Sequence, residues 1–193
     1  LRGNGTIAGA VTVTGGTLDL ATGRTLSVGS LALDPNSWLQ LSLGAPVAGG
    51  GNALLNVNGD LTLDGTLVIK DAGGFGTGVY RLMNYTGSLT DNGLKLGKLP
   101  GVVLESDLQV QTSVSNQVNL LYTAQDTSVQ FWDGANTIAN GVINGGSGIW
   151  SGPGIGDSSN NWTNVDGSSN RRWAGNFAVF QGAAGTVSLT TTH

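Results

Sequence analysis

Short stretches in which apolar and polar residues strictly alternate recur along most of the chain, for example at 39–43 (LQLSL) and 61–63 (LTL). A two-residue period places the apolar side chains on one face of an extended strand and the polar side chains on the other. Turn pairs such as Asn58-Gly59 and Asp64-Gly65 separate the stretches, and glycine supplies the positive φ that tight turns need. Helical periodicity is confined to a few residues at a time, so the sequence predicts an all-β fold with almost no helix.

The rhythm of strands and turns favours a coil over a set of hairpins. Many alternating stretches cover only about 3–5 residues, whereas strands in globular proteins average about 5–6. Three short strands and three corners per coil, each coil pairing in parallel with the next, fit this rhythm. The pattern therefore predicts a parallel β-helix, a solenoid in which Leu and Val stack inward. A repeat of roughly 20–25 residues would give about eight to nine rungs.

Composition excludes several other classes of protein. Charged residues make up 10% of the chain, the net charge is −4, and the few basic residues are scattered, so no basic stripe is available for nucleic acid. Gly is abundant at 33 residues but Pro is rare at 4, which argues against collagen, and the 39% apolar content argues against disorder. No apolar run approaches the roughly 18 residues of a membrane helix. With no cysteine, packing and hydrogen bonds must stabilise the fold.

The composition changes near Ala124. Residues 1–123 are rich in Leu, Val and Thr and predict regular rungs, whereas residues 124–185 are rich in Trp, Asn and Gly. Residues 186–193 resume the alternation and predict the start of a further rung. We expect 1–193 to be one continuous β-helix fragment that begins and ends inside a longer chain.

Three segments of the Trp-rich part carry a resemblance to a known family. They are 131–137 (FWDGANT), 161–164 (NWTN) and 173–187 (WAGNFAVFQGAAGTV). They resemble the autotransporter-associated β-strand repeat, which occurs in passenger domains of Gram-negative type V autotransporters. Residues 59–67 (GDLTLDGTL) and 73–82 (GGFGTGVYRL) are similar to the same passengers.

The resemblance implies a right-handed, single-stranded parallel β-helix. It also implies export through the periplasm and the outer membrane, and a location on the bacterial cell surface or in the medium. In this family a C-terminal barrel inserts into the membrane, and that barrel lies outside the present chain. We therefore expect no direct membrane insertion by this fragment.

Candidate catalytic and metal-binding groups are weak. The one histidine is the terminal His193, so no Ser-His-Asp arrangement is available. Asp60 with Asp64, and Glu105 with Asp107, are the acid pairs that a glycosidase or lyase would need, but acids beside glycine are common in turns. Residues 145–150 (GGSGIW) begin like a calcium-binding repeat but place Trp at the ligand position. The sequence predicts no catalytic, cofactor or metal site and no enzyme.

Four of the five tryptophans lie between residues 132 and 173, and the fifth is Trp38. Exposed, they would form a sugar-stacking platform or an adhesive patch. Buried, they would pack inside the helix, with each indole N–H donating to a turn carbonyl. We favour packing, because these residues carry the repeat signature. The candidate contact residues are Trp132, Trp150, Trp162 and Trp173.

The leading functional hypothesis is a structural stalk or adhesin segment of a surface passenger. Its expected partners are host-cell surfaces, matrix components or glycans. A carbohydrate-binding or polysaccharide-lyase-like β-helix is one alternative. A self-associating module for cell aggregation, with a second copy as partner, is another.

Overall fold

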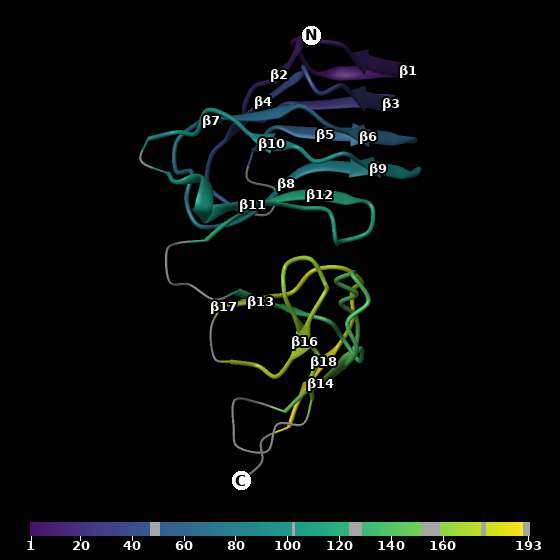
Figure 1. Cartoon of the computed structure of the whole chain (residues 1–193), viewed down its shortest axis with the longest axis vertical. Coiled ribbons are helices and arrows are strands. Elements are labelled where there is room, and N and C mark those ends of the chain that lie inside the picture. Colours follow the sequence, from purple (N-terminus) through teal and green to yellow (C-terminus); the bar gives the residue numbers. More distant parts are fainter. Residues whose placement is uncertain (47–50, 102, 124–128, 152–158, 175–176, 191–193) are drawn as a thin grey trace. The chain divides into compact units, whose positions relative to one another are not determined.

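The computed structural model describes residues 1–46, 51–101, 103–123, 129–151, 159–174 and 177–190. These residues form strands β1 to β18 and one short 3-10 turn, η1 (Glu105–Asp107), so the prediction of an all-β fold is confirmed (Figure 1). No described helix is long and apolar enough to span a membrane. The chain divides into two compact units. The first comprises 1–110 and 116–123, and the second comprises 111–115 and 124–193.

One sheet of the first unit is purely parallel. It pairs β10 with β7, β7 with β4, and β4 with β2. One row of this register consists of leucines that face the core: Leu18, Leu39, Leu67 and Leu96. The strands are β2 (Thr17–Leu20), β4 (Trp38–Leu43), β7 (Thr66–Asp71) and β10 (Lys95–Leu96).

The other sheet of the first unit is mixed. Its first strands all pair in parallel: β3 with β1, β5 and β6, then β5 with β8, and β6 with β9. The pairing between β8 and β12 is antiparallel, and β12 is followed in the sheet by β11. The bounds are β1 (Gly5–Val13), β3 (Thr25–Leu33), β5 (Leu54–Val57), β6 (Leu61–Leu63), β8 (Gly78–Tyr85), β9 (Leu89–Asp91), β11 (Leu108–Gln111) and β12 (Gln117–Tyr122).

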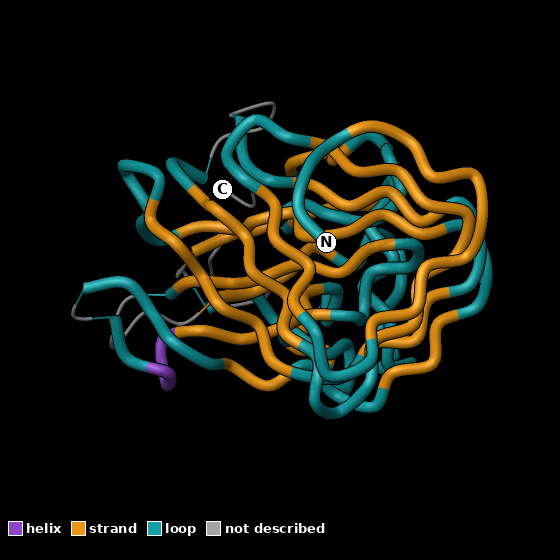
Figure 2. Tube along the Cα trace, turned by 90° about the horizontal axis from the view of Figure 1, so that it is seen from above, coloured by secondary structure: helices purple, strands orange, loops and turns teal. Residues whose placement is uncertain are grey.

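The interval between paired strands varies along the first unit, whose strands stack in layers (Figure 2). Thr17 of β2 pairs with Trp38 of β4, 21 residues later, whereas Asn56 of β5 pairs with Asn84 of β8, 28 residues later. Asn84 Nδ2 donates to Asn56 Oδ1, 28 residues earlier, over 2.8 Å. The Ser88 N–H likewise donates to Asp60, again 28 residues earlier. The predicted repeat was roughly 20–25 residues, so the interval between β2 and β4 agrees with it and the later intervals exceed it.

A column of glycines marks the bend in the mixed sheet. The first half of β3 pairs with β5 and its second half with β6, and Gly29 lies between the halves. A β-carbon on Gly59 would lie 2.6 Å from the Gly29 carbonyl oxygen, and one on Gly87 would lie 2.6 Å from the backbone of Gly59. Neither contact leaves room for a side chain, so backbones of successive strands approach closely only because glycine stands at each level.

The core of the first unit lies between its two sheets. The alternating leucines predicted to point inward do so: Leu39, Leu41 and Leu43 of β4 are fully buried. Tyr80 belongs to the same core and packs against Phe75, with ring centroids 4.9 Å apart.

The second unit has shorter strands and two small sheets. One sheet has the order β16-β15-β13-β17, in which β13 pairs in parallel with β17 and antiparallel with β15. The other pairs β14 in parallel with β18. The bounds are β13 (Val129–Trp132), β14 (Gly148–Trp150), β15 (Trp162–Thr163), β16 (Asn170–Arg171), β17 (Phe177–Val179) and β18 (Val187–Leu189).

Candidate functional site

The four tryptophans singled out from the sequence form one cluster in the second unit. Trp162 of β15 is its centre, with ring centroids 5.3 Å from Trp132, 5.0 Å from Trp150 and 4.5 Å from Trp173. The contacts to Trp132 and Trp150 are edge-to-face, a favourable geometry for aromatic pairs. Strands β13, β14 and β15 therefore bring together side chains that are far apart in the sequence.

Burial divides the cluster. Trp132 and Trp162 are fully enclosed, whereas Trp150 and Trp173 retain part of their surface. Only the latter pair has surface that a ligand could reach. Trp132 Nε1 donates to the Gly146 carbonyl over 2.9 Å, the kind of turn bond expected for a packed indole. The indole nitrogens of Trp150 and Trp162 are buried without an acceptor among the described residues.

Phe180 completes the cluster and was not predicted from the sequence. Its ring lies 5.7 Å from that of Trp162 and 6.0 Å from that of Trp132, yet the residue is 52% exposed. The apolar run 177–180 (FAVF) was the available signal. Phe180 therefore extends the buried cluster to the surface of the second unit.

A buried carboxylate holds the turns around the cluster. Asp133 is 1% exposed. One of its oxygens accepts the Asn144 N–H at 2.7 Å, and the other accepts side-chain N–H groups from Asn136 at 2.8 Å and Asn170 at 2.9 Å. Asn161 Nδ2 donates to two further backbone carbonyls. The Trp-Asp-Gly and Asn-Trp motifs thus supply hydrogen bonds that fix local backbone.

Of the two acid pairs considered as catalytic candidates, Asp60 and Asp64 bond to backbone. Asp60 Oδ1 accepts the Ser88 N–H at 2.8 Å, and Asp64 Oδ1 accepts the Gly65 N–H at 2.7 Å. Glu105 and Asp107 lie in the 3-10 turn. Within the described residues, no group of three or more His, Cys, Asp or Glu could hold a metal ion.

Shifted pKa values in the described chain have local causes. Hydrogen bonds from Ser168 lower the pKa of Asp166 below its ordinary value. Burial lowers the pKa of Arg81 and raises that of Tyr80. Asp71 and Tyr122 also raise the pKa of Tyr80, to a smaller extent than burial does.

A second candidate surface lies on the outward face of the parallel sheet. Trp38 is 46% exposed and is flanked in register by Thr17 and Thr66. The sequence set Trp38 apart from the other tryptophans but gave it no role. We call this the Trp38 surface, defined by Arg2, Asp19, Trp38, Gln40, Thr66, Lys70 and Lys95.

Comparison with known proteins gives one informative similarity. The chain is 46% identical over 166 residues to the adhesin BmaC autotransporter of Brucella suis biovar 1 (strain 1330). The alignment covers 83% of this chain but only 5% of that relative, so the chain spans a small part of its length. No protein-family model and no solved structure matches the chain.

The chain is therefore similar to one segment of an autotransporter. The similarity supports the prediction that the chain is a fragment of an autotransporter passenger. The more detailed assignment of 124–185 to a β-strand repeat stays a prediction.

Proposed function

We propose that the chain is a stalk segment of an autotransporter adhesin, folded as a right-handed parallel β-helix that supports or presents contact surfaces outside the bacterial cell. The observation that carries this proposal is the alternation of strands between two sheets. Along the chain, β2, β4, β7 and β10 enter the parallel sheet, while β3, β5 and β8 enter the other. From β1 to β10, each return to the same sheet adds a parallel strand to the stack, as coiling would produce. The later strand β12 departs from this pattern, because it pairs antiparallel with β8.

The character of the named relative supports the adhesive part of the proposal. That protein is an adhesin, and a surface-exposed or secreted, non-enzymatic role for this chain is consistent with it. The hydrogen bonding of Asp60 and Asp64 to turn N–H groups favours the same interpretation over a lyase. We extend the proposal to the whole of 1–193 as one β-helical fragment.

A deletion and replacement experiment in the full-length passenger tests this function. Removing the segment should reduce adhesion of the displaying bacteria. Replacing it with an equal length of an unrelated β-helix distinguishes a spacer from a surface that contacts the ligand. Restoration by the replacement would indicate a spacer, and failure of restoration would indicate a surface that contacts the ligand. Full adhesion by the deletion variant would contradict both.

The coil itself is tested by small-angle scattering of this chain and of longer passenger segments. A β-helix lengthens in proportion to the residues added, because each repeat contacts only its neighbours. The maximum dimension should therefore rise linearly with chain length. Growth with the weak power law of a compact globule would rule the coil out.

A further inference from the structure

Trp38 is an exposed aromatic side chain in the middle of a regular sheet face. It belongs to β4, between β2 and β7, and it is 46% exposed while Leu39 beside it is fully buried. The residues on either side in register are threonines, whose short side chains leave the indole open to solvent. Tryptophan is enriched at interfaces, because its ring is apolar and its N–H is polar.

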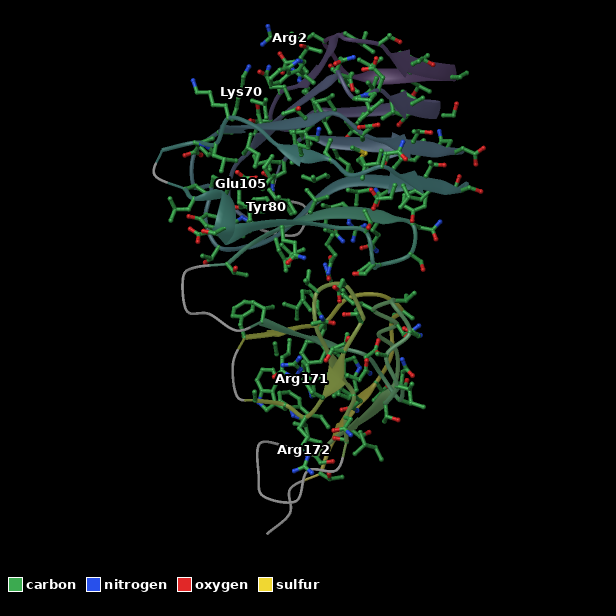
Figure 3. The ribbon with its side chains drawn as sticks, in the orientation of Figure 1. Arg2, Lys70, Tyr80, Glu105, Arg171 and Arg172 are labelled. Atoms are coloured by element: carbon green, nitrogen blue, oxygen red, sulfur yellow. The ribbon has the colours of Figure 1, made fainter. Side chains whose placement is uncertain are left out.

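Polar groups surround the indole on the same face. Gln40 follows Trp38 by one full strand period and pairs in register with Asp19 of β2. Asp19 Oδ2 lies 3.2 Å from Arg2 Nε and 3.9 Å from Lys70 Nζ. Figure 3 shows Arg2 and Lys70 reaching out from the same part of the first unit. The carboxylate thus holds two cations beside the sheet face.

The charge of this face is opposite to that of the chain. Three cationic side chains, Arg2, Lys70 and Lys95, accompany the single carboxylate of Asp19, although the whole chain carries a net charge of −4. Lys95 is exposed and lies in the row of Trp38 and Thr66.

The acids at the ends of β7 are engaged elsewhere. Asp71 accepts the N–H groups of Gly73 and Phe75, and Asp64 accepts that of Gly65. Their oxygens are therefore bound to turn N–H groups, although both carboxylates keep their negative charge.

We propose that the Trp38 surface binds an anionic polysaccharide, with a sugar ring stacked on Trp38 and carboxylate or sulfate groups paired with Lys70, Lys95 and Arg2. Lys95 lies two strands from Trp38, about 10 Å at ordinary strand spacing, a distance that a disaccharide spans. Gln40 is placed to hydrogen-bond sugar hydroxyls. The proposal rests on the adhesin function above and names its ligand class.

Biolayer interferometry with immobilised polysaccharides tests the ligand class. The probes are hyaluronan, which carries carboxylates, heparin, which also carries sulfates, and neutral dextran. We expect the chain to bind at least one anionic polysaccharide and to leave dextran unbound, with affinity falling as salt increases. The two anionic probes distinguish carboxylate from sulfate recognition. Equal binding to dextran, or no binding to either anionic probe, would overturn the proposal.

Substitutions locate the site. Trp38→Ala should weaken binding by about tenfold or more, as truncation of an interfacial Trp commonly does. Lys70→Ala with Lys95→Ala should weaken binding and also reduce its salt dependence. Phe177→Ala, at a similarly exposed aromatic residue, and Arg171→Ala with Arg172→Ala, at exposed basic residues, are the matched controls and should bind as the parent does.

Circular dichroism and thermal unfolding of each variant verify folding, and the exposure of Trp38 predicts little loss of stability. Unchanged binding by Trp38→Ala would exclude the site. Sedimentation showing dimers that Trp38→Ala converts to monomers would instead assign the surface to a second copy of the chain. If the parent chain binds neither anionic probe while segment-dependent adhesion of the full passenger persists, the ligand class is rejected and the adhesin function stands.

Discussion

Gly59 lies against the carbonyl oxygen of Gly29 so closely that a β-carbon on Gly59 would be 2.6 Å from that atom. Because the obstacle is backbone of the adjoining strand, it cannot rotate away as a side chain would. We therefore expect Gly59→Ala to lower the free energy of unfolding by about 1–3 kcal/mol, the usual cost of overpacking. Urea denaturation followed by circular dichroism measures this change.

Gly9→Ala is the matched control. A β-carbon at Gly9 would meet no atom within 4 Å, and Gly9 lies at the same bend of β1. This variant should unfold at nearly the parent urea concentration. Equal destabilisation by the two substitutions would show that close strand approach is not the cause.

Leu67→Ala tests the inward ladder of the parallel sheet. Leu67 is fully buried between Leu39 and Leu96 in register. Removing its side chain leaves a cavity, and we expect a loss of about 2–5 kcal/mol in the free energy of unfolding. Thr90→Ala, on the exposed face of β9, should change it little. Matching urea midpoints for the two variants would contradict the burial of this ladder.

Trp162→Ala tests whether the aromatic cluster is the core of the second unit. Trp162 is fully buried and contacts three other indoles, so its truncation should cost about 3–5 kcal/mol. Intrinsic fluorescence during thermal unfolding reports mainly on this unit, since Trp38 is the one tryptophan outside it. Phe177→Ala, at a residue that is 56% exposed, is the control. A Trp162→Ala protein as stable as that control would show that the cluster does not support the fold.

Alternation in the sequence could predict which side of a strand faces the core, but not which strand lies beside it. Leu39, Leu41 and Leu43 are buried as their period requires. Nothing in that period distinguishes the parallel partner of β8, which is β5, from the antiparallel partner, which is β12. The interval of 28 residues between Asn56 and Asn84 includes corner segments whose lengths do not follow the strand period.

The candidate site residues could likewise be predicted where local motifs mark them, but not where strand pairing brings them together. The Trp-rich motifs were recognisable, and Trp132, Trp150, Trp162 and Trp173 do gather. Trp38 drew no functional hypothesis, because its neighbours Asp19 and Lys70 belong to other strands and reach its face only through sheet register. The sequence of one strand predicts which side chains point outward. Which charged and polar groups surround such a side chain depends on how several strands pair.

Tyr80 gives the first unit a pH dependence in alkaline solution. Its buried hydroxyl donates to the Gly76 carbonyl over 2.8 Å and accepts the Gly76 N–H over 2.9 Å, and burial raises the pKa of the phenol. Below the unfolded-state pKa of about 10, the phenol is neutral in both states and its contribution to stability is complete. As the pH rises, the unfolded chain loses the proton first, so this contribution falls away as the pH rises through the folded-state pKa.

Tyr80→Phe isolates this effect. At neutral pH the variant should be less stable by about 0.5–1.5 kcal/mol, because it lacks the hydrogen bonds to Gly76. Above the tyrosine pKa of about 10 its stability should fall less steeply than that of the parent, because position 80 no longer ionises. Urea denaturation at a series of pH values from neutral to alkaline measures both quantities, and Tyr85 and Tyr122 remain in both proteins as an internal reference. Parallel stability curves across the alkaline range would show that Tyr80 ionises without cost in the folded state, and that its burial does not oppose the charge.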